Sequence, residues 1–82
     1  MFAGTRVTVD SIGRRCPLPI IDLARRLADV SVGELIELWS DDPAAEYDVA
    51  AWCRMRAQEL VEARPHPRRD GAVAYLIRRV TH

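Results

Sequence analysis

The sequence contains no lysine, because all twelve of its basic residues are arginine. Lysine Schiff bases and lysine nucleophiles are therefore excluded from its chemistry. Twelve acidic residues balance the arginines, so the formal net charge of +0 gives no overall field that would attract nucleic acid or an anionic membrane. Aromatic residues make up only 6% of the chain and do not interleave with the arginines as a base-stacking surface requires. Direct binding of nucleic acid is therefore not expected.

The chain also lacks a long apolar run. The longest, residues 72–77, is far too short to cross a bilayer. The first six residues contain no apolar segment of the kind found in a secretory signal. We therefore expect a soluble, cytoplasmic protein with no membrane partner.

Cysteine and histidine are scarce, and their spacing argues against two kinds of site. Cys16 and Cys53 form neither a CxxC pair nor a dense disulfide framework, so a reducing compartment would keep both thiols free. His66 and His82 lie in a proline-rich turn region and at the terminus, without metal-ligand spacing. We expect neither a metal nor a bound cofactor.

The first half of the chain predicts a strand, a helix and a second strand. Residues 6–10 alternate polar and β-branched apolar side chains, as a strand does. From Pro17 to about Asp29, apolar residues recur at the spacing of one helical face. After a break at Gly33, residues 34–40 are typical of a second strand. This succession implies a right-handed βαβ unit, so the two strands should be parallel.

A second helix should begin at Asp42-Pro43. Asp42 suits the N-cap and Pro43 the first helical position, and the apolar pattern continues to about Ala63. Cys53 falls in the apolar stripe of this helix. We therefore expect its thiol to be buried and not to be activated by a helix dipole.

The remaining residues predict a hairpin. Two prolines confine residues 64–69 to an edge strand, Asp70-Gly71 is a turn signal, and residues 72–80 form the last strand. The order βαβαββ predicts an α/β fold in which two helices cover one face of a four-stranded mixed sheet. The length of 82 residues predicts a single domain spanning residues 1–82.

One cysteine has a distinctive setting, the run Arg14-Arg15-Cys16-Pro17-Leu18-Pro19. Proline lacks an amide hydrogen and its φ is already near the helical value, so Pro17 and Pro19 suit a first helical turn. Cys16 then lies at or next to the N-cap, where unpaired amides, the helix dipole and two arginines favour a thiolate. We therefore interpret Cys16 as a nucleophile with a lowered pKa.

Two other interpretations of this run stay open. Cys16 could be a small buried hydrophobe beside prolines that stiffen a loop. Arg14 and Arg15 could be solvated surface charge, with no role at the thiol. The polar residues 10–15 argue against burial, because loops at the carboxyl end of a strand are where α/β proteins meet ligands.

Taken together, these features resemble the TusA (SirA-like) family of small sulfur-carrier proteins, over about residues 7–80. The resemblance is carried by Asp10, Gly13, the Cys16-Pro17-Leu18-Pro19 motif, Asp41-Asp42-Pro43 and the Tyr75-Leu76-Ile77-Arg78 strand. It implies a two-layer α/β sandwich related to the C-terminal domain of bacterial translation initiation factor three. Some relatives carry a glycine-proline break or a histidine in the second helix, where this chain has Ala50-Ala51 and Gln58.

The same resemblance implies a function. In this family the motif cysteine accepts sulfur as a persulfide from a donor such as a cysteine desulfurase or a rhodanese, and passes it to an acceptor protein. Cys16 is the matching residue here. Recipients serve tRNA thiolation, molybdenum cofactor assembly or sulfur metabolism, and no cofactor beyond the covalent sulfur is implied. The supporting motif positions are Asp10, Gly13, Arg14, Arg15, Pro17 and Pro19.

Functions of two other classes compete with a sulfur carrier. The arginine pairs at 25–26, 68–69 and 78–79, with the fold relationship, would suit an RNA-contacting module. A disulfide between Cys16 and Cys53 would suit a thiol-redox regulator, and it requires the two Cα atoms to approach within about 7 Å. A thiol hydrolase or protease would need a base paired with Cys16, and none is adjacent in sequence.

Overall fold

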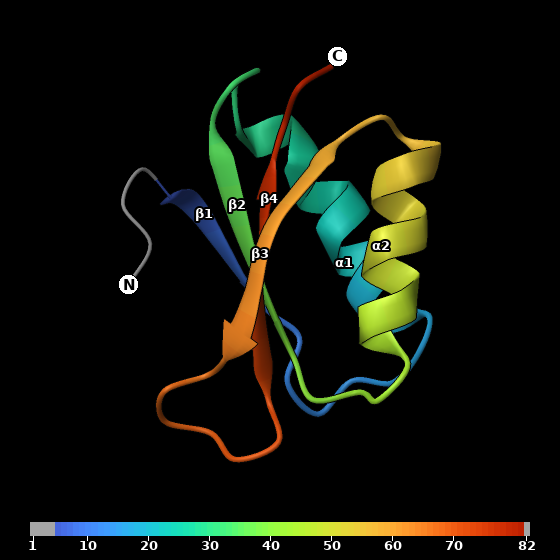
Figure 1. Ribbon diagram of the computed structural model, residues 1–82, viewed down its shortest axis with the longest axis vertical. Coiled ribbons are helices and arrows are strands. Elements are labelled where there is room, and N and C mark those ends of the chain that lie inside the picture. Colours follow the sequence, from blue (N-terminus) through green and yellow to red (C-terminus); the bar gives the residue numbers. More distant parts are fainter. Residues whose placement is uncertain (1–4, 82) are drawn as a thin grey trace.

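The computed structural model describes residues 5–81 of the chain (Figure 1). Residues 1–4 and His82 lie outside this range, so the expectations about the N-terminal segment and the terminal histidine fall largely on residues that are not described. Within residues 5–81, no helix is long and apolar enough to span a membrane. The elements in chain order are β1 (Thr5–Asp10), α1 (Leu18–Arg26), the 3-10 helix η1 (Leu27–Asp29), β2 (Leu35–Ser40), α2 (Ala45–Met55), β3 (Glu59–Pro65) and β4 (Val73–Arg78).

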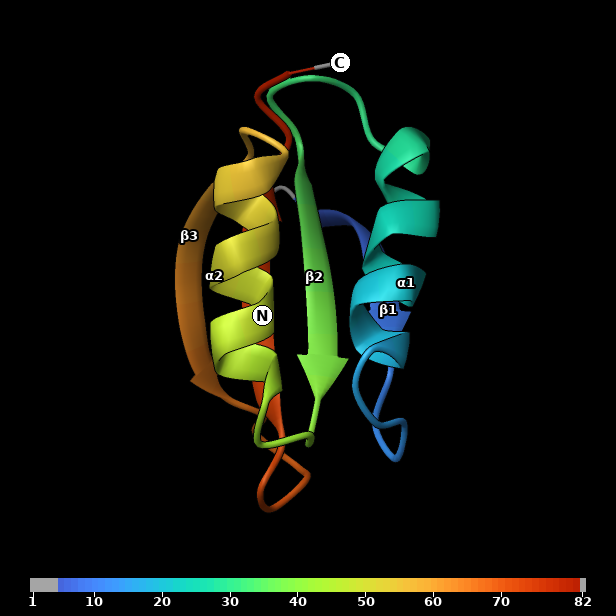
Figure 2. The same ribbon diagram turned by 90° about the vertical axis from the view of Figure 1, so that its right-hand side faces the viewer.

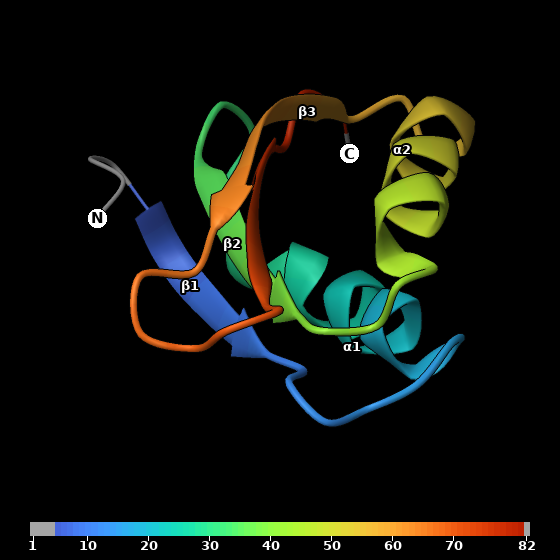
Figure 3. The same ribbon diagram turned by 60° about the horizontal axis from the view of Figure 1, so that its bottom comes forward.

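The four strands form one mixed sheet in the order β1-β2-β4-β3. β1 and β2 are parallel, whereas β4 runs antiparallel to both of its neighbours, β2 and β3. Both helices lie on the same face of this sheet (Figures 1 and 3). The predicted α/β sandwich with the order βαβαββ is therefore confirmed.

The core lies between the sheet and the two helices. Alternation along β2 turns Ile36 and Leu38 toward the helices, and both side chains are fully buried. Leu23 of α1, Val49 of α2 and Ile77 of β4 are equally inaccessible and belong to the same cluster. Each such side chain contributes about 1.5–3 kcal/mol by leaving water. This packing fixes the two helices on the sheet, and so fixes where their N-terminal ends lie.

The first helix follows the prediction, but the second is shorter. The apolar pattern predicts a helix over residues 42–63, whereas α2 ends at Met55. Ala57 then has a positive φ of 57°, and the buried side chain of Gln58 accepts the backbone N–H of Val80 through Oε1 at 2.8 Å. The predicted end of the helix is wrong because this contact between distant residues outweighs the local helix propensity. The sequence between Met55 and Ala63 contains no glycine or proline that would signal the end of the helix.

The closing hairpin is shifted for the same reason. The edge strand predicted for residues 64–69 is β3, which starts five residues earlier, so Leu60 packs against the core from a strand and not from a helix. A loop over residues 66–72, with Gly71 at φ 79°, joins β3 to β4 in place of a tight turn. β3 does lie at the edge of the sheet, as the prolines require.

Candidate functional site

Two loops meet at one end of the sheet. Because β1 and β2 are parallel, the loop that carries Cys16 and the loop that carries Asp41 and Asp42 leave the sheet at the same end (Figure 2). The helices α1 and α2 begin from these loops, so both N-terminal ends also lie there. The structure therefore places Cys16 at the carboxyl end of β1, as the sequence predicts.

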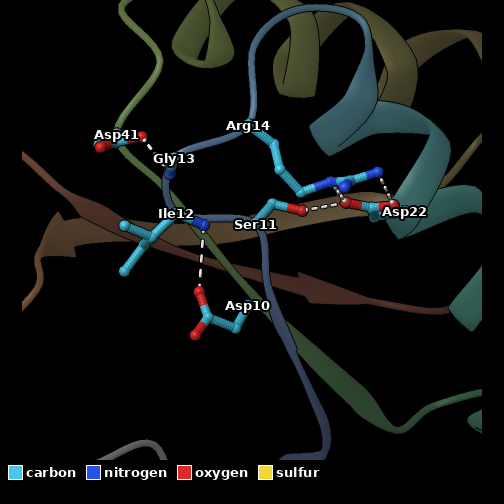
Figure 4. A network of polar contacts seen from close by, with 7 residues as sticks. All are labelled: Asp10, Ser11, Ile12, Gly13, Arg14, Asp22 and Asp41. Atoms are coloured by element: carbon cyan, nitrogen blue, oxygen red, sulfur yellow. Dashed lines mark hydrogen bonds and ion pairs between the residues drawn. The ribbon is translucent and has the colours of Figure 1, made fainter.

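The loop after β1 is held in shape by its own turn and by the neighbouring loop (Figure 4). Asp10 accepts the backbone N–H of Ile12 through Oδ1 at 3.0 Å. Gly13 adopts a φ of 86°, which residues with a Cβ rarely do, and donates its N–H to Oδ1 of Asp41 at 2.9 Å. Asp10 and Gly13 thus shape the loop that presents Cys16.

The two arginines before the cysteine have different surroundings. Arg14 forms an ion pair with Asp22 of α1, with 2.8 Å between Nε and Oδ2, and the hydroxyl of the buried Ser11 donates to the same carboxylate (Figure 4). Arg15 is exposed, and its backbone carbonyl accepts the N–H of Leu18 at 2.8 Å, at the start of α1. The side chain of Arg14 is therefore paired with a side chain of α1, whereas Arg15 contributes a backbone hydrogen bond to the turn before α1.

Cys16 lies next to the N-cap of α1, as predicted. Pro17 occupies the N-cap and Pro19 is buried within the first turn. The peptide bond between Cys16 and Pro17 is cis. The thiol of Cys16 is free and exposed, so the alternative of a small buried hydrophobe is wrong.

Asp42 links the two loops. The predicted N-cap is displaced by two residues, because α2 begins at Ala45 and Ala44 occupies its N-cap without a side-chain hydrogen bond. Asp42 instead accepts the N–H of Ala44 through Oδ1 at 3.3 Å and the N–H of Cys16 through Oδ2 at 2.8 Å. One carboxylate therefore ties the start of the second helix to the residue that bears the thiol.

The thiol of Cys16 faces acidic side chains. Its sulfur lies within 4.8 Å of one carboxylate oxygen each of Asp48, in α2, and Asp42. The hydrogen bond to Asp48, slight desolvation and the negative charges of Asp48 and Asp42 raise the pKa of Cys16. The prediction of a lowered pKa is therefore wrong, because two carboxylates outweigh the helix end and the neighbouring arginines.

No bound ion is needed to explain this cluster. Asp42 accepts hydrogen bonds from two backbone amides, and these bonds account for its position beside the thiol.

Cys53 lies in a contrasting environment. Its side chain is 3% exposed and belongs to the core cluster beside Val49 and Trp52. Burial raises the pKa of Cys53 to about 11. The prediction that Cys53 belongs to the apolar stripe and is not activated is therefore confirmed.

Several neighbours of Cys16 were not found from the sequence. The sequence marks Asp41 and Asp42 as a helix start and as part of the family resemblance, and it does not single out Asp48. A signal for the first two exists, because the predicted parallel pairing of the first two strands places their following loops at one end of the sheet. Asp48 has no comparable signal, since its direction depends on how α2 is rotated about its axis.

Comparison with known proteins gives relatives over nearly the whole chain. A family model described as "Sulfurtransferase TusA" matches residues 7–79. Two proteins of Archaeoglobus fulgidus, each named "Putative sulfur carrier protein", are 38% and 36% identical to this chain. The first alignment covers 85% of this chain and 88% of the relative, and the second covers 71% and 80%.

The fold also has a counterpart among crystal structures. The SirA-like protein from Desulfitobacterium hafniense matches it with a TM-score of 0.72, over 93% of this chain and 100% of the other. The sequence identity is 17%, so the likeness concerns the arrangement of the two helices and four strands.

Proposed function

Because this chain belongs to the TusA sulfurtransferase family, we propose that it is a sulfur carrier that takes up sulfur as a persulfide on Cys16 and relays it to an acceptor protein. The observation that carries the proposal is the position of Cys16, a free and exposed thiol on a loop at one end of the sheet. A donor protein and an acceptor protein must each reach the same sulfur in turn. Exposure on a loop is what such a relay requires.

Loading is a thiol exchange that needs no external oxidant. The thiolate of Cys16 attacks the terminal sulfur of the donor's persulfide, so that a new S–S bond forms while the donor's S–S bond breaks. The donor cysteine leaves as a thiolate with the bonding electron pair, and it takes up the proton that Cys16 lost. In delivery, a thiolate of the acceptor attacks the terminal sulfur on Cys16, and Cys16 becomes the leaving thiolate.

The surroundings of the thiol suit a stoichiometric carrier better than a self-contained catalyst. Among the described residues, the acid-base groups beside Cys16 are the carboxylates of Asp42 and Asp48. His66 lies elsewhere, with its ring against Trp39 at a centroid separation of 4.5 Å. A groove of about 360 Å³ between β1 and α1 includes Arg14 but not Cys16, so the thiol stands outside it. The substrate is therefore presented by a partner protein.

The acidic residues also bear on the class of partner. The carboxylates of Asp42 and Asp48 place negative charge beside the thiol, and no basic residue lies between positions 41 and 48. Phosphate backbones are repelled by such a surface. The acceptor that docks at Cys16 is therefore proposed to be a protein.

The proposal is tested by loading the protein with sulfur. After incubation with a cysteine desulfurase and cysteine, intact-mass measurement and peptide mapping without reductant should find one added sulfur atom on the peptide that contains Cys16. Cys16→Ser should abolish loading. Cys53→Ser should leave it nearly intact, because Cys53 is buried in the core. Sulfur found mainly on Cys53, or loading that persists in Cys16→Ser, would refute the proposal.

A further inference from the structure

The side chain in contact with the proposed sulfur-bearing thiol comes from the second helix. A carboxylate oxygen of Asp48 lies within 4.8 Å of the sulfur of Cys16, although the two residues are far apart in the chain. Asp42, in the loop before this helix, accepts the backbone N–H of Cys16 at 2.8 Å and so holds the residue that bears the thiol. The sulfur and both carboxylates lie within 4.8 Å of one another.

We propose that Asp48 is a positioning residue that disfavours the Cys16 thiolate, so that the free carrier keeps its thiol protonated when empty and keeps its sulfur when loaded. The inference rests on the proposed function and deepens it. Asp48 acts through Cys16 and takes no part in bond making. The sulfur transfer steps remain those of the thiol and its partners.

The charges around Cys16 decide the sign of this effect. On its own loop, Arg14 is neutralised by Asp22, and Arg15 projects from an exposed position. From the neighbouring segments come Asp42 and Asp48, whose negative charges both raise the pKa of the thiol. A carboxylate that accepts S–H stabilises the protonated form and repels the thiolate that would replace it. The net local influence on Cys16 is therefore negative.

The consequence for the empty carrier is a low reactivity toward adventitious electrophiles. The thiolate is the reacting form of cysteine, and a raised pKa leaves less of it near neutral pH. The thiolate that does form is intrinsically more nucleophilic, because nucleophilicity rises with pKa. A partner that displaces or neutralises Asp48 when it docks would therefore raise the fraction of thiolate at the moment of transfer.

In the loaded carrier, Asp48 affects the step in which Cys16 leaves its persulfide sulfur. When any nucleophile attacks the terminal sulfur, Cys16 must leave as a thiolate, and a thiol of higher pKa leaves more slowly. Asp48 and Asp42 repel the charge that forms on the leaving sulfur. The persulfide should therefore resist small thiols and cyanide while the carrier is free.

The first experiment uses the unloaded protein and is independent of sulfur transfer. The rate of Cys16 alkylation by iodoacetamide is followed against pH by peptide mapping, for the wild type, Asp48→Asn and Glu46→Gln. Asp48→Asn should react several-fold faster near neutral pH and show a lower apparent pKa, because the amide carries no charge and can donate to a thiolate. Glu46→Gln removes the same charge from the same helix, two residues away, and should match the wild type.

Two further variants separate positioning from a general loss of structure. Asp48→Glu restores a carboxylate on a longer side chain and should return the pH profile toward that of the wild type. Asp48→Ser removes the carboxylate without adding volume, so it gives the same test if the asparagine variant does not fold. Circular dichroism of each variant verifies the fold.

The second experiment measures retention of sulfur. Cyanide attacks the terminal sulfur of the loaded protein, thiocyanate is released, and Cys16 leaves as a thiolate that takes up the proton. Asp48→Asn should release thiocyanate several-fold faster than the wild type, and Glu46→Gln should not.

The outcomes of the two experiments are distinguishable. An alkylation rate that is unchanged or lower in Asp48→Asn overturns the role of Asp48, and a lower rate would make this side chain a base that activates the thiol. Failure to load any variant refutes the proposed function instead, while the alkylation result still decides the charge effect. Equal thiocyanate release from wild type and Asp48→Asn overturns the inference about retention.

Discussion

The two cysteines of this protein both resist ionisation, but for opposite physical reasons. Cys53 lies in the core, and burial alone raises its pKa to about 11. Cys16 is exposed, and its pKa is raised first by the hydrogen bond to Asp48, then by desolvation and then by the charges of Asp48 and Asp42. The burial of Cys53 lasts as long as the fold does. The restraint on Cys16 comes from two side chains at the surface, which a partner or a substitution can change without unfolding the core.

The largest expected difference between the two thiols is their access to reagents. In the native protein, iodoacetamide should label Cys53 about 100-fold or more slowly than Cys16, because a buried thiol reacts only after the core opens. Peptide mapping after a short pulse gives both rates. In denaturant the two rates should converge. Comparable native rates would show that α2 does not keep Cys53 in the core and would remove the basis of the comparison.

The pH dependence of stability should distinguish the thiols next. The pKa of Cys53 is raised in the folded state, so folding binds this proton more tightly and stability falls as pH rises from about 9 to about 11. The contribution is fully present below the unfolded pKa, lost above the folded one, and on the order of 2–3 kcal/mol. Urea unfolding across this range should show the loss in the wild type and a smaller loss in Cys53→Ala.

Cys16→Ser is the matched control for this measurement. It keeps Cys53, and it keeps Tyr75, whose pKa is also raised by burial and by Glu46 and Asp42. Cys16 also has a raised pKa, so its removal takes away its own share of the decline, while the share that depends on Cys53 should remain. A decline that is equally reduced in both variants would show that burial of Cys53 is not its source.

The sequence predicts well the features that depend on local pattern. The alternation of residues 6–10, the apolar face that follows Pro17 and the hairpin near Asp70-Gly71 each correspond to an element of the structure. Parallel pairing of the first two strands, which the βαβ rule supplies, places Cys16 at the correct end of the sheet. The fold and the position of the exposed thiol therefore follow from periodicity, prolines and connection rules.

What the sequence does not predict is decided by contacts between distant residues. The end of α2 depends on Gln58, whose side chain accepts the N–H of Val80. The raised pKa of Cys16 depends on Asp48, thirty-two positions away in the chain. The charged residues adjacent to Cys16 in the sequence are Arg14 and Arg15, and in the structure Arg14 is paired with Asp22. Electrostatics at a surface site is set by which side chains the packing of the helices brings together.

The smallest effect concerns the loop that presents Cys16. Gly13 and Gly33 have φ angles of 86° and 93°, and a Cβ added at either would meet no atom within 4 Å. Replacement by alanine should therefore cost backbone strain alone, about 1–2 kcal/mol at each position. The two glycines lie in loops at opposite ends of the sheet, and only the N–H of Gly13 binds Asp41 beside the thiol (Figure 2).

Gly13→Ala and Gly33→Ala should thus lose similar stability in thermal unfolding but differ at Cys16. Relief of strain at position 13 weakens the hydrogen bond from Gly13 to Asp41 and moves the thiol relative to Asp42 and Asp48. The alkylation rate of Cys16 should change by about twofold in Gly13→Ala, since a small displacement alters the contacts that set its thiolate fraction. The rate should not change in Gly33→Ala, and labelling of Cys53 should respond equally to both variants. If Gly33→Ala altered Cys16 as much as Gly13→Ala does, the reactivity of this thiol would report overall stability and not the geometry of its loop.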